Sequence, residues 1–108
     1  MDESEFNQRV DGVIELIEER LDELDVDLDY DSAGGILSIT FEDNSKVIIN
    51  RQTPLKQIWV ATKSGGFHFD FNADVDAWLK DDDGMELFTA LTKYCTEQAG
   101  ETITIAAS

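Results

Sequence analysis

The fold is decided by residues 6–30, FNQRVDGVIELIEERLDELDVDLDY, in which one hydrophobic period gives way to another. From Phe6 to Leu24 the apolar side chains recur every three or four residues, which predicts an amphipathic helix with Ser4 as its N-cap. Beyond the helix the period changes to two, because Leu28 and Tyr30 alternate with acidic residues, and this alternation predicts a short strand. Acidic side chains on such a strand are typical of a sheet edge, where charge discourages unwanted pairing. We therefore expect a helix that leads directly into the edge of a sheet.

The predicted helix also carries a stripe of carboxylates along one side. At about 100° per residue, five acidic positions fall within an arc of roughly 80°, opposite the apolar face. Like charges four residues apart destabilise a helix by about 0.2–0.5 kcal/mol per pair, so the stripe costs stability. Two interpretations fit it, a solvated face of an acidic protein and a ridge that binds cations. The stripe consists of Asp11, Glu15, Glu18, Asp22 and Asp25, with Glu19 and Glu23 beside it and Asp27, Asp29 and Asp31 continuing it onto the strand.

Composition limits the class of protein. The 108 residues predict a single domain, 1–108, with one core, and 42% hydrophobic residues exclude a disordered acidic tail. The net charge of −16, from 24 acidic and 8 basic residues, argues against binding to nucleic acid or to an anionic membrane through a basic patch. We expect the partners to be metal cations or a basic protein surface.

The expected location is the cytoplasm. The chain opens with Met-Asp-Glu-Ser-Glu and not with the basic and apolar segments of a signal peptide. No apolar run approaches the roughly 20 residues that are needed to span a bilayer. The single cysteine, Cys95, fits a reducing compartment and is interpreted as a small core residue.

After the first helix, alternating stretches predict a run of antiparallel strands. Two hairpins are indicated, one with its turn at residues 42–45 and one with its turn at residues 64–66. The first hairpin follows a turn at Gly34 and Gly35. The predicted strands are Ile36–Phe41, Lys46–Asn50, Gln57–Thr62, Phe67–Asn72 and a short strand at Trp78–Lys80.

A second helix is predicted near the end of the chain. Asp83 as its N-cap and Glu86 at its third position would form a capping box, and Gly100 is a typical residue at which a helix stops. The order of helix, antiparallel strands and helix predicts an α+β fold. It is a two-layer α/β sandwich, in which the antiparallel sheet has the N- and C-terminal helices packed on one face. The other face of the sheet is then open to solvent.

The alternation within the strands indicates which side chains occupy that open face. If Ile58 and Val60 point to the helices, then Gln57, Trp59 and His68 point outward. Trp59 then places a large aromatic ring on a polar surface, which is typical of a hot spot in a protein interface. The opposite arrangement, with Trp59 inside, stays open at this point.

Residues 50–70, NRQTPLKQIWVATKSGGFHFD, resemble the signature of the frataxin family in its bacterial, CyaY-type form. The flanking stretches are similar to the same family. They are the first helix FNQRVDGVIELIEERLDELD, the hairpin GGILSITFEDNSKVIINRQ and the second helix DGMELFTALTKYCTEQAGE. The resemblance covers essentially the whole chain without a large insertion.

The resemblance implies a protein that binds Fe²⁺ or Fe³⁺ weakly, at several surface sites, where other divalent or lanthanide ions can substitute. It also implies a role in iron–sulfur cluster assembly through contact with the cysteine desulfurase and the iron–sulfur scaffold protein. The protein is expected to be mainly a monomer, with metal-dependent oligomers. Whether it donates iron, senses it or inhibits the desulfurase stays open.

The resemblance also implies which residues take these roles. Some bacterial members have a histidine early in the first helix, where this chain has Asn7, so that nitrogen ligand is absent. Together with Glu15 of the stripe, the implied metal ligands are Glu18, Glu19, Asp22, Glu23, Asp25, Asp27 and Asp29, and the implied partner-binding residues are Asn50, Gln57 and Trp59.

No enzyme is expected. A di-iron oxidase site uses glutamates and Glu-x-x-His motifs from several helices, whereas the only histidine here, His68, lies on a predicted strand. His68 is interpreted as an exposed sheet residue or an accessory metal contact. The spacing Asp70-x-Asn72-x-Asp74 resembles a calcium loop by chance, because Val75 replaces the turn glycine. A ferroxidase or iron-detoxifying protein is the alternative, and a generic acidic protein is the third hypothesis.

Overall fold

The predicted amphipathic helix forms α1 (Glu3–Asp22). The computed structural model describes residues 1–107. The predicted N-cap was wrong, because Asp2 caps the helix and its Oδ1 accepts a 2.8 Å hydrogen bond from Glu5 N. Asp2 has an extended backbone, so Ser4 already lies inside the first turn. The buried side chains of α1 are Phe6, Val10, Ile14, Ile17 and Leu21.

Helix α1 also ends earlier than predicted. Glu23 is its C-cap, with its N–H directed at the carbonyl oxygens of Arg20 and Leu21. Acids in the last turn oppose the helix dipole, which favours ending the helix here. Asp25 was expected on the helix, but it lies in the connection that leads to the first strand.

Six strands follow, and they form one antiparallel sheet in the order of the sequence, β1-β2-β3-β4-β5-β6. Strand β4 has the predicted bounds, whereas β3 is two residues longer than predicted because its ladder to β4 continues to Gln52. A 3₁₀ turn, η1 (Thr53–Leu55), contains the only proline and joins β3 to β4. The strands are β1 (Leu28–Ala33), β2 (Ile36–Phe41), β3 (Lys46–Gln52), β4 (Gln57–Thr62), β5 (Gly65–Asn72) and β6 (Ala77–Lys80).

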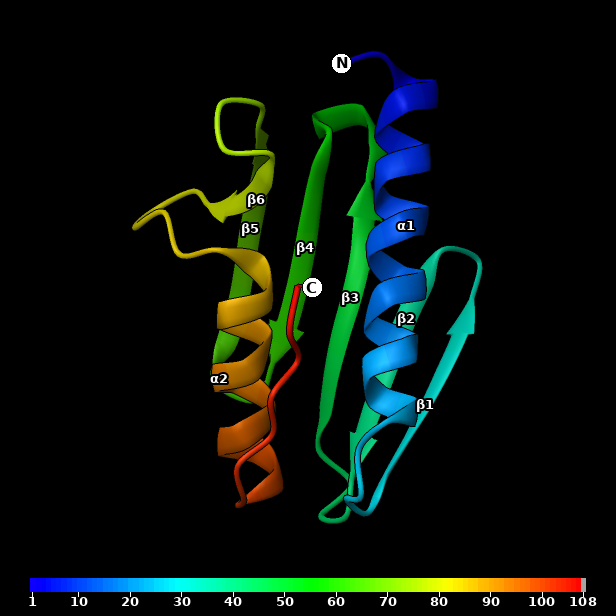
Figure 1. The fold of residues 1–108 in the computed structure, drawn as a ribbon, viewed down its shortest axis with the longest axis vertical. Coiled ribbons are helices and arrows are strands. Elements are labelled where there is room, and N and C mark those ends of the chain that lie inside the picture. The colour runs from blue at the N-terminus through cyan, green and yellow to red at the C-terminus, as the bar shows by residue number, and fades with distance from the viewer. Residues whose placement is uncertain (108) are drawn as a thin grey trace.

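Both helices cover the same face of this sheet (Figure 1). The two-layer α+β sandwich predicted from the sequence is therefore confirmed. Ile58 and Val60 are buried beneath the helices, so Trp59 between them points to the outer face, as predicted. Fully burying a side chain of this kind contributes about 1.5–3 kcal/mol. The buried strand residues are Leu37, Ile39, Phe41, Val47, Ile49, Ile58, Val60, Phe69 and Trp78.

Helix α2 (Leu87–Ala99) begins later than predicted, and the predicted cap was wrong. Glu86 is the N-cap, because its carboxylate accepts hydrogen bonds from Phe88 N at 2.8 Å and Thr89 N at 3.1 Å. Lys80 N donates to Met85 O at 2.8 Å, so the preceding residues stay paired with the end of β6 and cannot start a helix. Gly100 ends α2 in the left-handed conformation with φ 74°, as predicted.

The end of the chain fills the space between the two helices, which the sequence analysis did not predict. Ile103 N donates to Thr96 Oγ1 at 3.0 Å, and Ile105 N donates to Thr92 Oγ1 at 2.9 Å. Both isoleucines are at most 1% exposed. In Figure 1 this red segment runs alongside α2 and over the sheet. The tail therefore completes the hydrophobic core.

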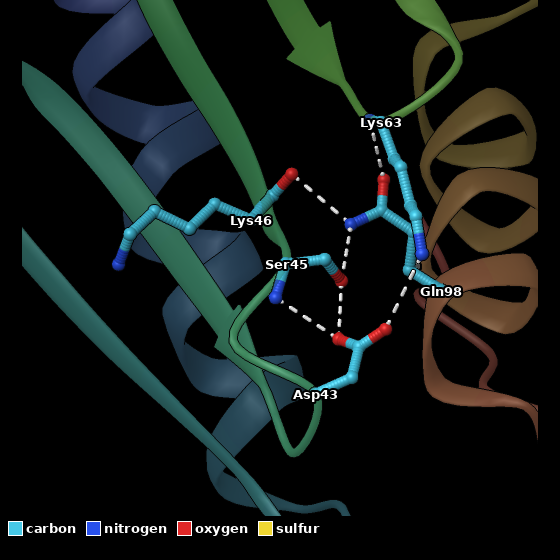
Figure 2. A network of polar contacts seen from close by, with 5 residues as sticks. All are labelled: Asp43, Ser45, Lys46, Lys63 and Gln98. Atoms are coloured by element: carbon cyan, nitrogen blue, oxygen red, sulfur yellow. Dashed lines mark hydrogen bonds and ion pairs between the residues drawn. The ribbon is translucent and has the colours of Figure 1, made fainter.

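A polar network ties two hairpin turns to the end of α2 (Figure 2). The side-chain amide of Gln98 donates to Ser45 Oγ at 3.0 Å and to Lys46 O at 3.1 Å, while its oxygen accepts from Lys63 N at 2.9 Å. Asp43 holds the first turn by accepting from Ser45 Oγ at 2.6 Å. Every polar atom of the Gln98 side chain is thus used to connect the turns to α2.

Among the described residues, neither helix is both long and apolar enough to cross a membrane.

Candidate functional site

The predicted metal ligands lie along α1 and around the adjacent edge of the sheet. Glu15, Glu18, Glu19 and Asp22 project from α1, and Glu23 caps it. Glu18 is half-buried, whereas the other four side chains are exposed. We call the following eight residues the acidic ridge: Glu15, Glu18, Glu19, Asp22, Glu23, Asp25, Asp27 and Asp29.

At the sheet edge, the acidic ridge continues on the face of β1 that points away from α1. Tyr30 and Ser32 point from β1 toward α1, since Tyr30 Oη donates to Asp22 Oδ1 at 2.6 Å and Ser32 Oγ donates to Glu18 Oε2 at 3.4 Å. Asp29 alternates with Tyr30 along β1, so it lies on the opposite face of that strand. The ridge therefore passes from the helix, through the connection that holds Asp25 and Asp27, to the outer face of β1.

The negative charge of the ridge is almost uncompensated. Within residues 1–107, Glu23 is the one ridge residue with an ion pair, at 3.2 Å from Arg20 Nη1. Arg20 also donates from Nε to Ala106 O at 3.0 Å, so it is held by the tail as well. Asp11, which the sequence placed on the same stripe, is paired with Arg51 Nη2 at 2.6 Å. Uncompensated charge of one sign raises the local concentration of cations.

The hydrogen bond between Tyr30 and Asp22 changes the pKa of the tyrosine hydroxyl. The bond to Asp22 and the negative charges of Asp22 and Glu18 raise the pKa of Tyr30 above its ordinary value. The neutral tyrosine hydroxyl therefore remains a donor to the ridge at physiological pH. This contact was not predicted, although the alternation of Tyr30 with acids was its signal in the sequence.

The ridge is not a preformed metal cage. In the part of the chain that the structure describes, no three His, Cys, Asp or Glu side chains converge closely enough to hold an ion together. Carboxylate oxygens accept hard cations and iron, and they discriminate poorly among them. Such an arrangement fits weakly held ions that keep most of their water ligands.

Further carboxylates from other elements gather near the end of the ridge. Asp27 lines a surface hollow of about 400 Å³ together with residues from the β2–β3 turn and from the end of α2. The acidic residues that share this hollow are Glu42, Asp43, Glu97 and Glu101. They extend the negative potential of the ridge. This grouping could not be predicted from the sequence, because the residues are distant in the chain.

The three predicted partner-binding residues lie together on the outer face of the sheet. Asn50 on β3 is directly opposite Trp59 on β4. The indole Nε1 of Trp59 donates to Gln57 Oε1 at 2.8 Å, and Gln57 Nε2 donates to Asp70 Oδ1 at 3.1 Å. These bonds fix the orientation of a partly exposed indole ring. The outer face therefore offers a preorganised aromatic surface next to polar groups.

The imidazole of His68 stacks on this indole ring. Their centroids are 4.4 Å apart with an interplanar angle of 18°, because His68 on β5 is directly opposite Trp59. His68 Nδ1 also lies 3.6 Å from Asp81 Oδ2. The sequence alternation placed His68 on this face, but it did not predict the approach of Asp81, which depends on the pairing of β5 with β6.

Known proteins are similar to this chain over nearly its whole length. Residues 1–101 match the model of the frataxin-like domain. The iron–sulfur cluster assembly protein CyaY of Vibrio parahaemolyticus is 45% identical over 103 residues, which are 95% of this chain and 97% of that relative. The solved structure of frataxin from Psychromonas ingrahamii matches with a TM-score of 0.90 and 40% identity, covering 98% of this chain and 99% of that one.

Proposed function

Since this chain belongs to the frataxin family, as its sequence predicted, we propose that it supports or regulates iron–sulfur cluster assembly. It carries weakly bound iron on the acidic ridge and docks on the assembly machinery through the outer face of its sheet. The similar Vibrio protein bears the name of an iron–sulfur cluster assembly protein, which supports the general role.

The observation that carries this proposal is the uncompensated charge of the ridge. Only Glu23 among its eight described carboxylates has a cationic partner. A face kept merely for solubility would tolerate mixed charges, which cost less repulsion along a helix. The oxygen ligands suit Fe²⁺ and Fe³⁺, and their spread along an edge suits several weak sites. The iron is a cargo in this proposal, and the chain acts by binding, without catalysis of its own.

The outer face supports the second half of the proposal. Trp59 is held by hydrogen bonding and by stacking, so little conformational freedom is lost when a partner covers it. Asn50 and Gln57 supply hydrogen-bonding groups beside the ring. The partners we propose for this surface are the cysteine desulfurase and the iron–sulfur scaffold protein. We place this role in the cytoplasm, in keeping with the single buried and unpaired cysteine.

The test is a pull-down of purified desulfurase and scaffold by the immobilised chain, with and without Fe²⁺ under anaerobic conditions. The parent should retain at least one partner, and Trp59→Ala should weaken retention by roughly 2 kcal/mol, or about 30-fold. Lys93→Ala, an exposed position on α2 away from the outer face, is the control and should bind like the parent. Equal retention of Trp59→Ala and the parent would refute docking through this face.

A further inference from the structure

We propose that His68 and Asp81 form a separate site for a transition-metal ion that prefers nitrogen ligands, such as Zn²⁺, Ni²⁺ or Cu²⁺. His68 Nδ1 and Asp81 Oδ2 lie 3.6 Å apart on the outer face of the sheet. Their side chains are 44% and 43% exposed, so an ion can reach both. The site is distinct from the acidic ridge and does not depend on the function proposed for it.

The two ligands are held in place before any ion arrives. Asp81 N donates a 2.9 Å hydrogen bond to His68 O, which fixes the backbone of Asp81 beside β5. The imidazole is held in its plane by the stacked indole of Trp59, at 4.4 Å between centroids. Holding ligands in their binding geometry reduces the entropy that binding must overcome.

The separation of the two atoms suits a shared ion. Zn²⁺ holds nitrogen and oxygen ligands at about 2.0–2.2 Å, and two such ligands at a tetrahedral angle are about 3.3 Å apart. A small rotation of the Asp81 carboxylate would shorten the observed 3.6 Å between His68 Nδ1 and Asp81 Oδ2 to this separation. Among residues 1–107 no third His, Cys, Asp or Glu completes the site, so water fills the other positions.

The charges around the pair favour a cation. Asp70 lies two residues from His68 on the same face of β5, and the whole chain has a net charge of −16. The neighbouring cation is directed elsewhere, because Lys80 Nζ lies 5.0 Å from the ring centroid of Phe67 and 3.2 Å from Asp83. Phe67 stacks on Tyr94 of α2, so this ammonium group is on the helix side of the sheet.

The ligand chemistry separates this site from the ridge. An imidazole nitrogen selects Zn²⁺, Ni²⁺ and Cu²⁺, whereas carboxylate and water oxygens suit Ca²⁺, Mg²⁺ and Mn²⁺. The ridge contains no histidine or cysteine, so it lacks the nitrogen ligand that raises the affinity for these ions. Trp59 provides a reporter next to the site, since a paramagnetic ion at His68 broadens the signal of its indole N–H.

The experiment is an NMR titration of the tag-free, isotope-labelled chain with substoichiometric Cu²⁺, with Zn²⁺ as a competitor and Mn²⁺ as the oxygen-preferring comparison. Cu²⁺ should broaden the Trp59 indole signal and the amides of His68 and Asp81 before those of the ridge, and Zn²⁺ should restore them. Mn²⁺ should broaden the ridge first. Broadening by Cu²⁺ that is centred on the ridge would overturn the site.

The variants distinguish a metal site from a simple ion pair. His68→Phe keeps an aromatic ring on Trp59 but removes the nitrogen, so Cu²⁺ should bind at least about tenfold more weakly there. Asp81→Asn keeps the size of the side chain and should weaken binding in the same direction. A ridge variant, Glu15→Gln with Glu19→Gln, should leave the effect on Trp59 unchanged. If His68→Phe binds Cu²⁺ at this face as tightly as the parent, the proposal is wrong.

Discussion

The hydroxyl of Tyr30 donates a 2.6 Å hydrogen bond to Oδ1 of Asp22, and this bond ties β1 to the last turn of α1. It joins the helix and the edge strand, which lie on either side of the connection that holds Asp25 and Asp27. The bond holds one ridge carboxylate in a defined position, whereas Glu15, Glu19 and Asp29 accept no hydrogen bond within residues 1–107. The ridge thus combines three hydrogen-bonded carboxylates, Glu18, Asp22 and Glu23, with several free ones.

The Tyr30 bond should make stability depend on pH in the alkaline range. Its folded-state pKa is raised above the ordinary 10.0, so the stabilisation is present below pH 10 and is lost as the pH rises through the raised value. Tyr30→Phe should therefore lower the urea midpoint at pH 7, and the difference from the parent should shrink well above pH 10. Tyr94→Phe is the control at pH 7, because the buried Tyr94 hydroxyl has no partner in the described chain and its removal should cost nothing there. A difference for Tyr30→Phe that is independent of pH would contradict this assignment.

Trp59 should contribute little to folding for an aromatic residue of its size. Trp59→Ala removes a stacked pair and an exposed-face hydrogen bond, which predicts a loss of about 1–2 kcal/mol in the free energy of unfolding. Trp78→Ala, at a position only 4% exposed, should lose about 3–5 kcal/mol. Urea denaturation of the two variants measures both values. Equal losses would show that Trp59 is part of the core.

The C-terminal tail should be essential for stability. Ile103→Ala empties a fully buried position and should cost about 2–5 kcal/mol. Thr104→Ala changes the adjacent exposed side chain and should stay within about 0.5 kcal/mol of the parent. Thermal denaturation of both variants tests this. A small effect of Ile103→Ala would mean that the tail is not docked between the helices in solution.

Gln98 should stabilise the two hairpin turns through its three hydrogen bonds (Figure 2). Gln98→Ala should cost about 2 kcal/mol, since each bond contributes about 0.5–1.5 kcal/mol. Hydrogen exchange of the Lys63 amide should accelerate in the same variant, because this amide donates to Gln98. The adjacent exposed change Glu97→Ala is the control and should leave both measurements close to the parent. Unchanged exchange at Lys63 in Gln98→Ala would contradict the network.

Much of the fold could be predicted from hydrophobic period alone. The alternation of Ile58 and Val60 around Trp59 favoured the observed orientation of β4, because a one-residue shift would have exposed both apolar side chains. The burial of both side chains in the structure excludes the opposite orientation, which the sequence had left open. The bounds of the helices were less predictable. Asp83 and Glu86 have the spacing of a capping box, which predicted Asp83 as the N-cap. The hydrogen bond from Lys80 to Met85 holds that segment against β6, so Glu86 is the N-cap instead.

Contacts between distant segments could not be predicted. The alternation of Thr102, Ile103, Thr104 and Ile105 is too short to indicate where the tail packs, and the bonds to α2 depend on the assembled fold. The approach of Asp81 to His68 likewise follows from the β5–β6 register. The acidic ridge was recognised as a stripe because its helical residues share one arc, whereas the position of Asp29 on the far side of β1 required the structure.

In the proposed function, the carboxylates of the ridge are kept for metal binding and not for folding. The most direct test of this claim is the shift in melting temperature that Fe²⁺ causes under anaerobic conditions, in three proteins. The first is the parent. The ridge variant combines Glu15→Gln, Glu19→Gln and Asp29→Asn. These three carboxylates have no hydrogen-bond or ion-pair partner within residues 1–107. The control variant removes the same charge elsewhere and combines Glu3→Gln, Asp74→Asn and Asp76→Asn.

A cation at about 1 mM with a dissociation constant on the order of 100 μM stabilises the folded state by roughly 1.4 kcal/mol per site. For a chain of this size that is roughly 5–10 °C in melting temperature. The parent and the control variant should show this shift beyond the screening effect of sodium chloride at matched ionic strength. The ridge variant should be more stable than the parent without metal, because repulsion is relieved, and should lose most of the shift. A ridge variant that is less stable without metal, or that shifts as far as the parent with it, would contradict the claim.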